Sequence, residues 1–157
     1  MAFREKTAWI SIFVTVLIWG SYFGDLMPNL LSARPNLEGM LGDFFSSVTL
    51  AVILQIVLMI IIAILSPKDA DAPADERERL IEFRSTTIAY NVLVVMLVVA
   101  VLGAPAVSLY HAIKAGIAPN LGTAVIPMAN GVLLALVLAE IAKYVAQLVQ
   151  FRRGTMA

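Results

Sequence analysis

Few residues of this chain are suited to chemistry, and the most unusual of them stand inside long apolar segments. Four polar side chains are candidates for an intramembrane site, namely Gln55, Asn91, Asn130 and Glu140. Glu140 is the sharpest candidate, because a carboxylate in hydrocarbon is costly and such residues usually handle a proton, an ion or another charged group. The set points to proton or cation handling, or to polar contacts between helices.

The position of Glu140 along its segment favours a plainer interpretation. At 1.5 Å per residue it stands about 24 Å from Ala124, where the fourth predicted helix begins, which predicts a place near the cytoplasmic boundary. Lys143 and Tyr144 follow three and four residues later on the same helical face. We therefore expect Glu140 to be paired at the boundary, and its candidate partners are Lys143, Arg84 and Asn91.

Patterns typical of catalysis or metal binding do not occur in the sequence. There is no cysteine, which excludes disulfides, thiolate metal sites and thiol nucleophiles. The single histidine, His111, is a weak candidate ligand for a haem or chlorophyll, alone or together with Met128. An imidazole at the outer membrane boundary needs no cofactor to explain it. We predict no catalytic residues, no metal site and no cofactor, and the chain is predicted not to be an enzyme.

The composition indicates that these residues lie in a membrane protein. Of 157 residues, 61% are hydrophobic and 14% charged, and the net charge is zero, so nucleic acid is not an expected partner. Uncharged segments of 18, 24, 26 and 25 residues are each long enough to cross a bilayer as a helix. The sequence predicts a single all-α domain over residues 1–157, a four-helix transmembrane bundle with helices at 7–23, 44–65, 86–110 and 124–147.

The distribution of Lys and Arg predicts the orientation of the bundle. Nine of these residues fall on the side that holds both termini and two, Arg34 and Lys114, on the other. Positive residues are retained on the cytoplasmic side, so both termini are predicted to be cytoplasmic. The first helix follows Arg4 and Lys6 as a signal peptide would, but no small-x-small cleavage site follows Trp19, and we expect an uncleaved anchor.

The two longer connections differ in character. Residues 25–43 contain Pro, Gly and Leu, and are expected to form either a connector that rests partly on lipid or short amphipathic turns at the outer interface. The cytoplasmic loop, residues 66–84, ends in a charged segment that Asp75 and Glu78 begin with the spacing of a capping box. We predict a cytoplasmic helical extension that runs into the third membrane helix without a break, either as a solvated extension or as a docking surface for a soluble partner.

The fourth segment also carries a row of small residues at spacings of four, four, three and four. Small side chains allow helices in lipid to approach closely, so this row predicts a packing surface, within the bundle or against another subunit. Helix breakers stand nearby, Gly103 and Pro105 in the third segment and Pro127 in the fourth. The members of the row are Gly131, Ala135, Ala139, Ala142 and Ala146.

Three segments resemble a bacterial family. The opening ten residues, residues 75–92 and the closing residues 151–154 are similar to bacterial four-helix inner-membrane proteins grouped as a domain of unknown function. The resemblance implies a multi-pass protein of the bacterial inner membrane and no particular reaction.

Three functions are compatible with this sequence. The first is a non-enzymatic accessory or structural subunit of a larger membrane assembly, in contact with lipids and with other subunits or further copies of itself. The second is a small oligomeric transporter or ion pathway that uses Glu140, helped by Asn91 and Gln55. The third is a regulatory membrane protein that signals through the helix at residues 75–84.

Overall fold

The computed structural model describes residues 3–31, 37–65, 75–116 and 121–153. These ranges hold four helices, each with a segment long and apolar enough to cross a membrane. The prediction of an all-α chain with four membrane-length helices is confirmed. The helices are α1 (Phe3–Leu31), α2 (Leu37–Leu65), α4 (Glu76–Lys114) and α5 (Leu121–Arg153).

The helices are longer than predicted, and the difference is greatest in residues 25–43. The predicted outer connection is wrong at residues 25–31 and 37–43, because α1 continues to Leu31 and α2 already begins at Leu37, while residues 32–36 lie outside the described residues. Charged residues mark the edge of the hydrocarbon, whereas a helix ends only where its backbone hydrogen bonds end. Asp25 and Asp43 therefore lie inside helices, and Pro28 is accommodated in the last turn of α1.

Of the predicted loop at residues 66–84, the structure describes residues 75–84, which are helical from Glu76 as predicted, and their cytoplasmic location stays a prediction. Asp75 is the N-cap of α4, with its carboxylate accepting a 2.7 Å hydrogen bond from the backbone N–H of Glu76. From there α4 continues through Pro105 to Lys114 without interruption. Its C-cap is Ala115, and the next residue is Gly116, whose φ of +69° is a conformation that favours glycine. The charged segment and the third span are thus one rigid element.

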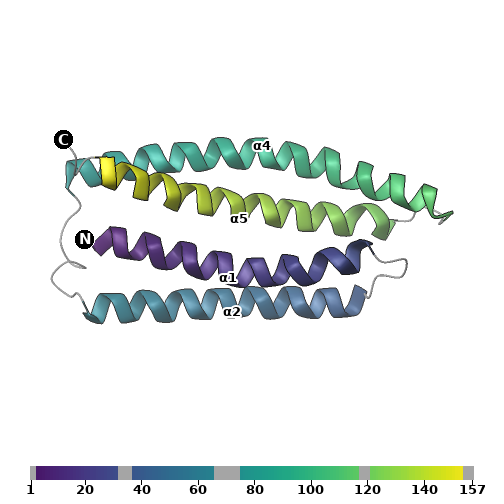
Figure 1. Cartoon of the computed structure of the whole chain (residues 1–157), viewed down its shortest axis with the longest axis horizontal. Helices are drawn as coiled ribbons and strands as arrows, with labels where there is room; N and C mark the ends of the chain where they lie inside the picture. The colour runs from purple at the N-terminus through teal and green to yellow at the C-terminus, as the bar shows by residue number, and fades with distance from the viewer. Residues whose placement is uncertain (1–2, 32–36, 66–74, 117–120, 154–157) are drawn as a thin grey trace.

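The four helices are arranged as two hairpins joined through their middle members. Figure 1 shows the spatial order α4, α5, α1, α2, with α1 beginning and α5 ending at the same end. Contact is most extensive between α4 and α5, and α1 packs against both α5 and α2. The described parts of α2 and α4 share no comparable contact, so the ring of a closed four-helix bundle stays open. Hydrocarbon supplies no hydrophobic force that would close it.

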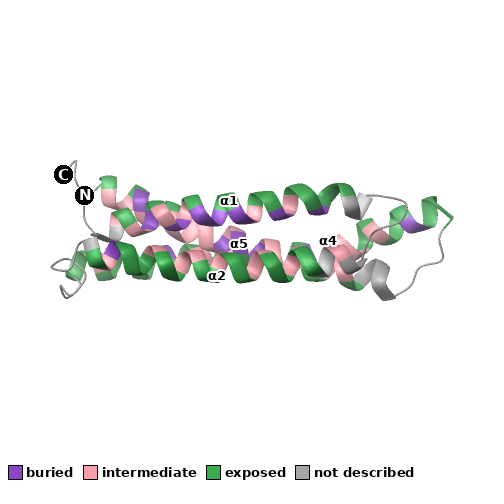
Figure 2. Cartoon of the chain, turned by 90° about the horizontal axis from the view of Figure 1, so that it is seen from below, coloured by how far each residue is buried: buried purple, intermediate pink, exposed green. Residues whose placement is uncertain are grey.

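Burial in this structure runs opposite to hydropathy. The span of α1 has a mean hydropathy of 1.6 and is 33% buried, whereas that of α2 has 2.9 and is 6% buried. Figure 2 shows exposed residues along α2 where its burial is described, over residues 42–64. Large apolar side chains such as Leu50, Ile53 and Ile60 are more than half exposed. A surface of this kind is stable in lipid and not in water, as expected for a multi-pass membrane protein.

Small side chains set the close approach of α4 and α5. A Cβ atom added to Gly131 would lie 3.0 Å from the Cβ of Ala100 and 3.6 Å from that of Ala104. Ala135 is fully buried and Ala139 is 7% exposed, while Ala142 and Ala146 are half-buried. The small-residue row of α5 therefore lies inside the chain, and its first member packs against small residues of α4.

This packing predicts the effect of filling the space at Gly131. Replacing Gly131 by Leu should destabilise the α4–α5 hairpin by about 1–3 kcal/mol, because the side chain has to displace the Ala100 backbone. The measurement is the thermal unfolding midpoint in detergent. Gly20→Leu is the matched control, since nothing lies within 4 Å of its Cβ position. Equal midpoints for the two variants would contradict close packing at Gly131.

Candidate functional site

The contact between α1 and α5 is the candidate site, because it gathers most of the buried polar side chains. We call Ser11, Tyr22, Asn130, Glu140 and Tyr144 the polar seam. Ser11 and Tyr22 of α1 are 5% and 4% exposed, and the three α5 residues are half-buried. This seam is the main connection between the two hairpins.

Tyr22 organises the end of the seam that is remote from the termini. Its hydroxyl donates a 2.6 Å hydrogen bond to Oδ1 of Asn130, and the Asn130 amide donates in turn to the carbonyl of Ile126 at 3.0 Å. The Tyr22 ring meets Phe23 and Phe44 edge-on, with ring centres 5.1 and 6.3 Å apart. One tyrosine thus ties α1 to α5 by a hydrogen bond and to α2 by aromatic contact.

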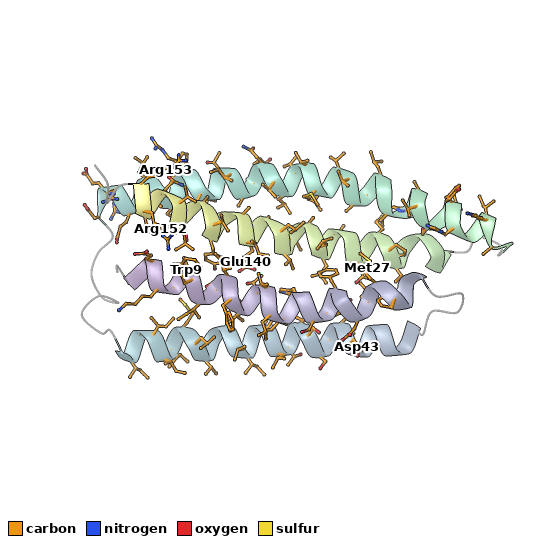
Figure 3. All side chains as sticks on the ribbon, viewed as in Figure 1. Trp9, Met27, Asp43, Glu140, Arg152 and Arg153 are labelled. Carbon is orange, nitrogen blue, oxygen red and sulfur yellow. The ribbon has the colours of Figure 1, made fainter. Side chains whose placement is uncertain are left out.

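Glu140 belongs to the other half of the seam. The Tyr144 hydroxyl interacts with the side chains of Ser11 on α1 and of Glu140 one turn earlier on α5. Figure 3 shows Glu140 between α5 and α1. Among the described residues, the Glu140 carboxylate interacts with the Tyr144 hydroxyl, and no hydrogen bond or ion pair joins it to the predicted partners Lys143, Arg84 or Asn91. The Tyr144 hydroxyl therefore links Glu140 on α5 to Ser11 on α1.

The register of α1 against α5 places Glu140 farther from the ends of the apolar segments than its position along α5 alone indicates. Tyr144 is level with Ser11 and Asn130 with Tyr22, so Glu140 is level with Val14 and Thr15. Thr15 is nine residues after Lys6 and ten before Asp25, or about 14 Å from each charged position. Glu140 thus lies beside the middle of the apolar segment of α1, and its location near the cytoplasmic boundary stays a prediction.

Gln55 approaches the same layer from α2. It lines a cavity of about 10 Å³ between α1 and α2, to which Ser11 also contributes. A cavity of this size holds about one water molecule, and two polar side chains are the minimum that such a water needs. Ser11 faces this cavity on one side and Tyr144 on the other, so polar groups from three helices meet at Ser11. The remaining lining residues are Ile10, Val14, Leu58 and Met59.

A cation–π contact closes the seam at the end that holds the termini. The guanidinium of Arg152 lies 5.6 Å from the centre of the Trp9 ring, which Figure 3 shows at that end. Nearby, Arg77 of α4 donates a 3.5 Å hydrogen bond to the carbonyl of Phe151. The start of α4, the start of α1 and the end of α5 are held together here.

Two predicted residues lie away from the seam. Asn91 is exposed on α4, and its side chain makes no hydrogen bond within the described ranges. His111 is exposed in the last turn of α4, with its ring 5.7 Å from that of Tyr110. Within the described residues, no three His, Asp or Glu side chains are grouped as a metal site would require. The arrangement is suited to binding a proton or a small cation at Glu140, or to holding helices together.

Ser11, Thr15 and Tyr22 were not singled out by the sequence analysis, although a signal was present. They stand at spacings of four and seven in the least hydropathic of the spans and are all at most 5% exposed. In a membrane helix, polar residues repeated on one face mark the side that contacts protein. The small residues of α4 that face Gly131, Ala100 and Ala104 at an interval of four, were missed in the same way.

Comparison of the chain with models of protein families, with curated proteins and with solved structures finds no match. The similarity to a bacterial inner-membrane family stays a prediction.

The Tyr22–Asn130 hydrogen bond can be measured by a double-mutant cycle. Tyr22→Phe and Asn130→Val should show a coupling free energy of about 0.6–1.7 kcal/mol, the range expected for hydrogen bonds between membrane helices. Unfolding in detergent provides the free energies. Tyr110→Phe is the control, since this tyrosine is 62% exposed. A coupling of zero would show that the bond does not contribute to joining α1 and α5.

Proposed function

We propose that this chain is a non-enzymatic subunit of a larger assembly in the bacterial inner membrane. The observation that carries the proposal is an exposed amide in a span that otherwise faces lipid. Gly131 of α5 packs on Ala100 of α4. Asn91 lies nine residues before Ala100, and Glu140 lies nine residues after Gly131. Because α4 and α5 are antiparallel, Asn91 and Glu140 are level with each other. An amide at this depth is stabilised by a hydrogen bond to another protein surface.

The shape of the chain supports the same proposal. The spans of α2 and α4 are each only 6% buried, so two long helices are available to neighbours. The cavity that Ser11 and Gln55 line has room for about one water and not for an organic substrate. Contact surfaces, more than an enclosed site, are what this structure offers.

Purification in mild detergent tests the proposal. We expect a complex larger than the monomer, with components at fixed stoichiometry in native mass spectrometry. Asn91→Leu should reduce the share of that complex, because leucine is equivalent to lipid as a neighbour and removes the amide. The matched control is Val95→Leu, one turn away on the same exposed side of α4. A wild-type chain that is monomeric under conditions that preserve known complexes would refute the assembly role.

The proposal includes an orientation, with both termini in the cytoplasm. Support comes from the nine-to-two distribution of Lys and Arg together with the common end of α1 and α5 in Figure 1. The chain has no cysteine, so single cysteines report topology directly. In intact cells, an impermeant thiol reagent should label Ala115→Cys and leave Glu76→Cys unlabelled. The reverse pattern would invert the orientation.

A second candidate function, a proton or cation pathway, is favoured by the depth of Glu140. A carboxylate level with the middle of α1, with the Tyr144 hydroxyl beside it, is suited to exchanging a proton or binding a monovalent cation. One chain holds little more than one water there, so a continuous path would require an oligomer.

Proteoliposomes distinguish the two functions. If the chain conducts protons or cations, a pH-sensitive or cation-sensitive dye inside the vesicles should report flux that Glu140→Gln abolishes. Tyr144→Phe, which removes the hydroxyl beside Glu140, should lower that flux without abolishing it. The absence of flux above that of empty vesicles, with the complex intact, would leave the assembly role alone.

A further inference from the structure

One continuous face of α4 is exposed from its first turns to the middle of its span. Its members repeat at intervals of four, three, four, three, four and four residues, the spacing with which two helices pack along a common seam. All of them are exposed, while Ser85 and Ala100 on the opposite side of α4 are buried. The members of this face are Leu80, Arg84, Thr87, Asn91, Val94, Val98 and Leu102.

Asn91 is the polar group in the apolar part of this face that makes no hydrogen bond to the described residues. Thr87 lies one turn earlier, and its hydroxyl donates a 3.0 Å hydrogen bond to the carbonyl of Phe83 within the helix. Asn91 has no such partner among the described residues. Its neighbours toward the far end, Val94 and Val98, are apolar and 42% and 55% exposed.

We propose that this face binds the same face of a second copy of the chain, with the two α4 helices parallel and related by a twofold axis along the membrane normal. This inference rests on the proposed assembly role and names its partner. The side chain of Asn91 both donates and accepts, so two copies facing across the axis satisfy each other. Copies in one membrane share one orientation, which brings Asn91 opposite Asn91.

The surrounding residues fit this partner. A single asparagine in an otherwise apolar seam fixes the register of two parallel helices, and Val94, Val98 and Leu102 supply the apolar contacts. Arg84 stands about 10 Å from Asn91 along the helix. Its long side chain can extend to the aqueous boundary, so it does not have to face Arg84 of the second copy. Apolar helices gain little free energy from associating in lipid, so the Asn91–Asn91 hydrogen bond is what favours a second copy of the chain as the partner.

Disulfide cross-linking in native membranes tests the seam. The full chain with Val98→Cys should form a covalent dimer under mild oxidation, since this position lies on the proposed axis. Val99→Cys is the matched control, because Val99 is the next residue, is 56% exposed against 55% for Val98, and points about 100° away. We expect at least about a threefold higher dimer fraction for Val98→Cys than for Val99→Cys, the ratio equivalent to an average hydrogen bond between membrane helices.

The role of the amide is tested in the Val98→Cys chain. Adding Asn91→Leu should lower the dimer fraction about three- to tenfold, and adding Asn91→Gln should retain most of it. Equal cross-linking of Val98→Cys and Val99→Cys would overturn the proposed seam. An unchanged dimer fraction with Asn91→Leu would overturn the amide pairing.

The same samples separate this inference from the assembly role. If Val98→Cys yields no dimer while native mass spectrometry shows a complex with other proteins, the second copy is wrong and the assembly role stands. If the chain is monomeric by both measurements, both proposals fail. A dimer that carries no other component supports the inference and limits the assembly to copies of this chain.

Discussion

Hydrocarbon provides no hydrogen-bond partners, and this constraint explains why the polar side chains of the structure gather between α1 and α5. Ser11, Tyr22, Asn130, Glu140 and Tyr144 satisfy one another, or nearby carbonyls, across one helix contact. The constraint also explains the inverse relation between hydropathy and burial. The mean hydropathy of the four spans rises from 1.6 in α1 through 2.0 and 2.7 to 2.9 in α2, while their buried shares fall from 33% to 6%. Lipid solvates the apolar helices, and the protein interior solvates the polar ones.

Two kinds of contact hold the chain together, and they act at different places. Within the α4–α5 hairpin, Gly131 and the alanines allow backbones to approach, and many weak van der Waals contacts accumulate along the helices. Between the hairpins, a few directional contacts connect α1 to α5, including Tyr22 with Asn130 and Trp9 with Arg152. Each is worth on the order of 1 kcal/mol. The junction therefore depends on a few side chains, and single substitutions there affect the arrangement of whole hairpins.

The sequence predicted those features that depend on one segment at a time. Helix number follows from the uncharged segments, and the start of α4 follows from the capping side chain of Asp75. Features that depend on how two helices pack against each other could not be predicted from one segment. The depth of Glu140 is fixed by what α1 places opposite it, and the partner of Gly131 by the register of α4. The ends of α1 and α2 were missed because Asp25 and Asp43 end the hydrocarbon without ending the helix.

The depth of Glu140 follows from the stagger of the two hairpins. If the bilayer is centred on α1, midway between Lys6 and Asp25, Glu140 lies about 2 Å from the midplane. If it is centred on the uncharged part of α4, residues 85–110, the register at Gly131 places Glu140 about 10 Å away. Both values are smaller than the half-thickness of the hydrocarbon, about 15 Å. Asn91, level with Glu140 in the α4–α5 hairpin, is inside by the same argument, so the enclosed carboxylate and the exposed amide occupy one layer of the membrane.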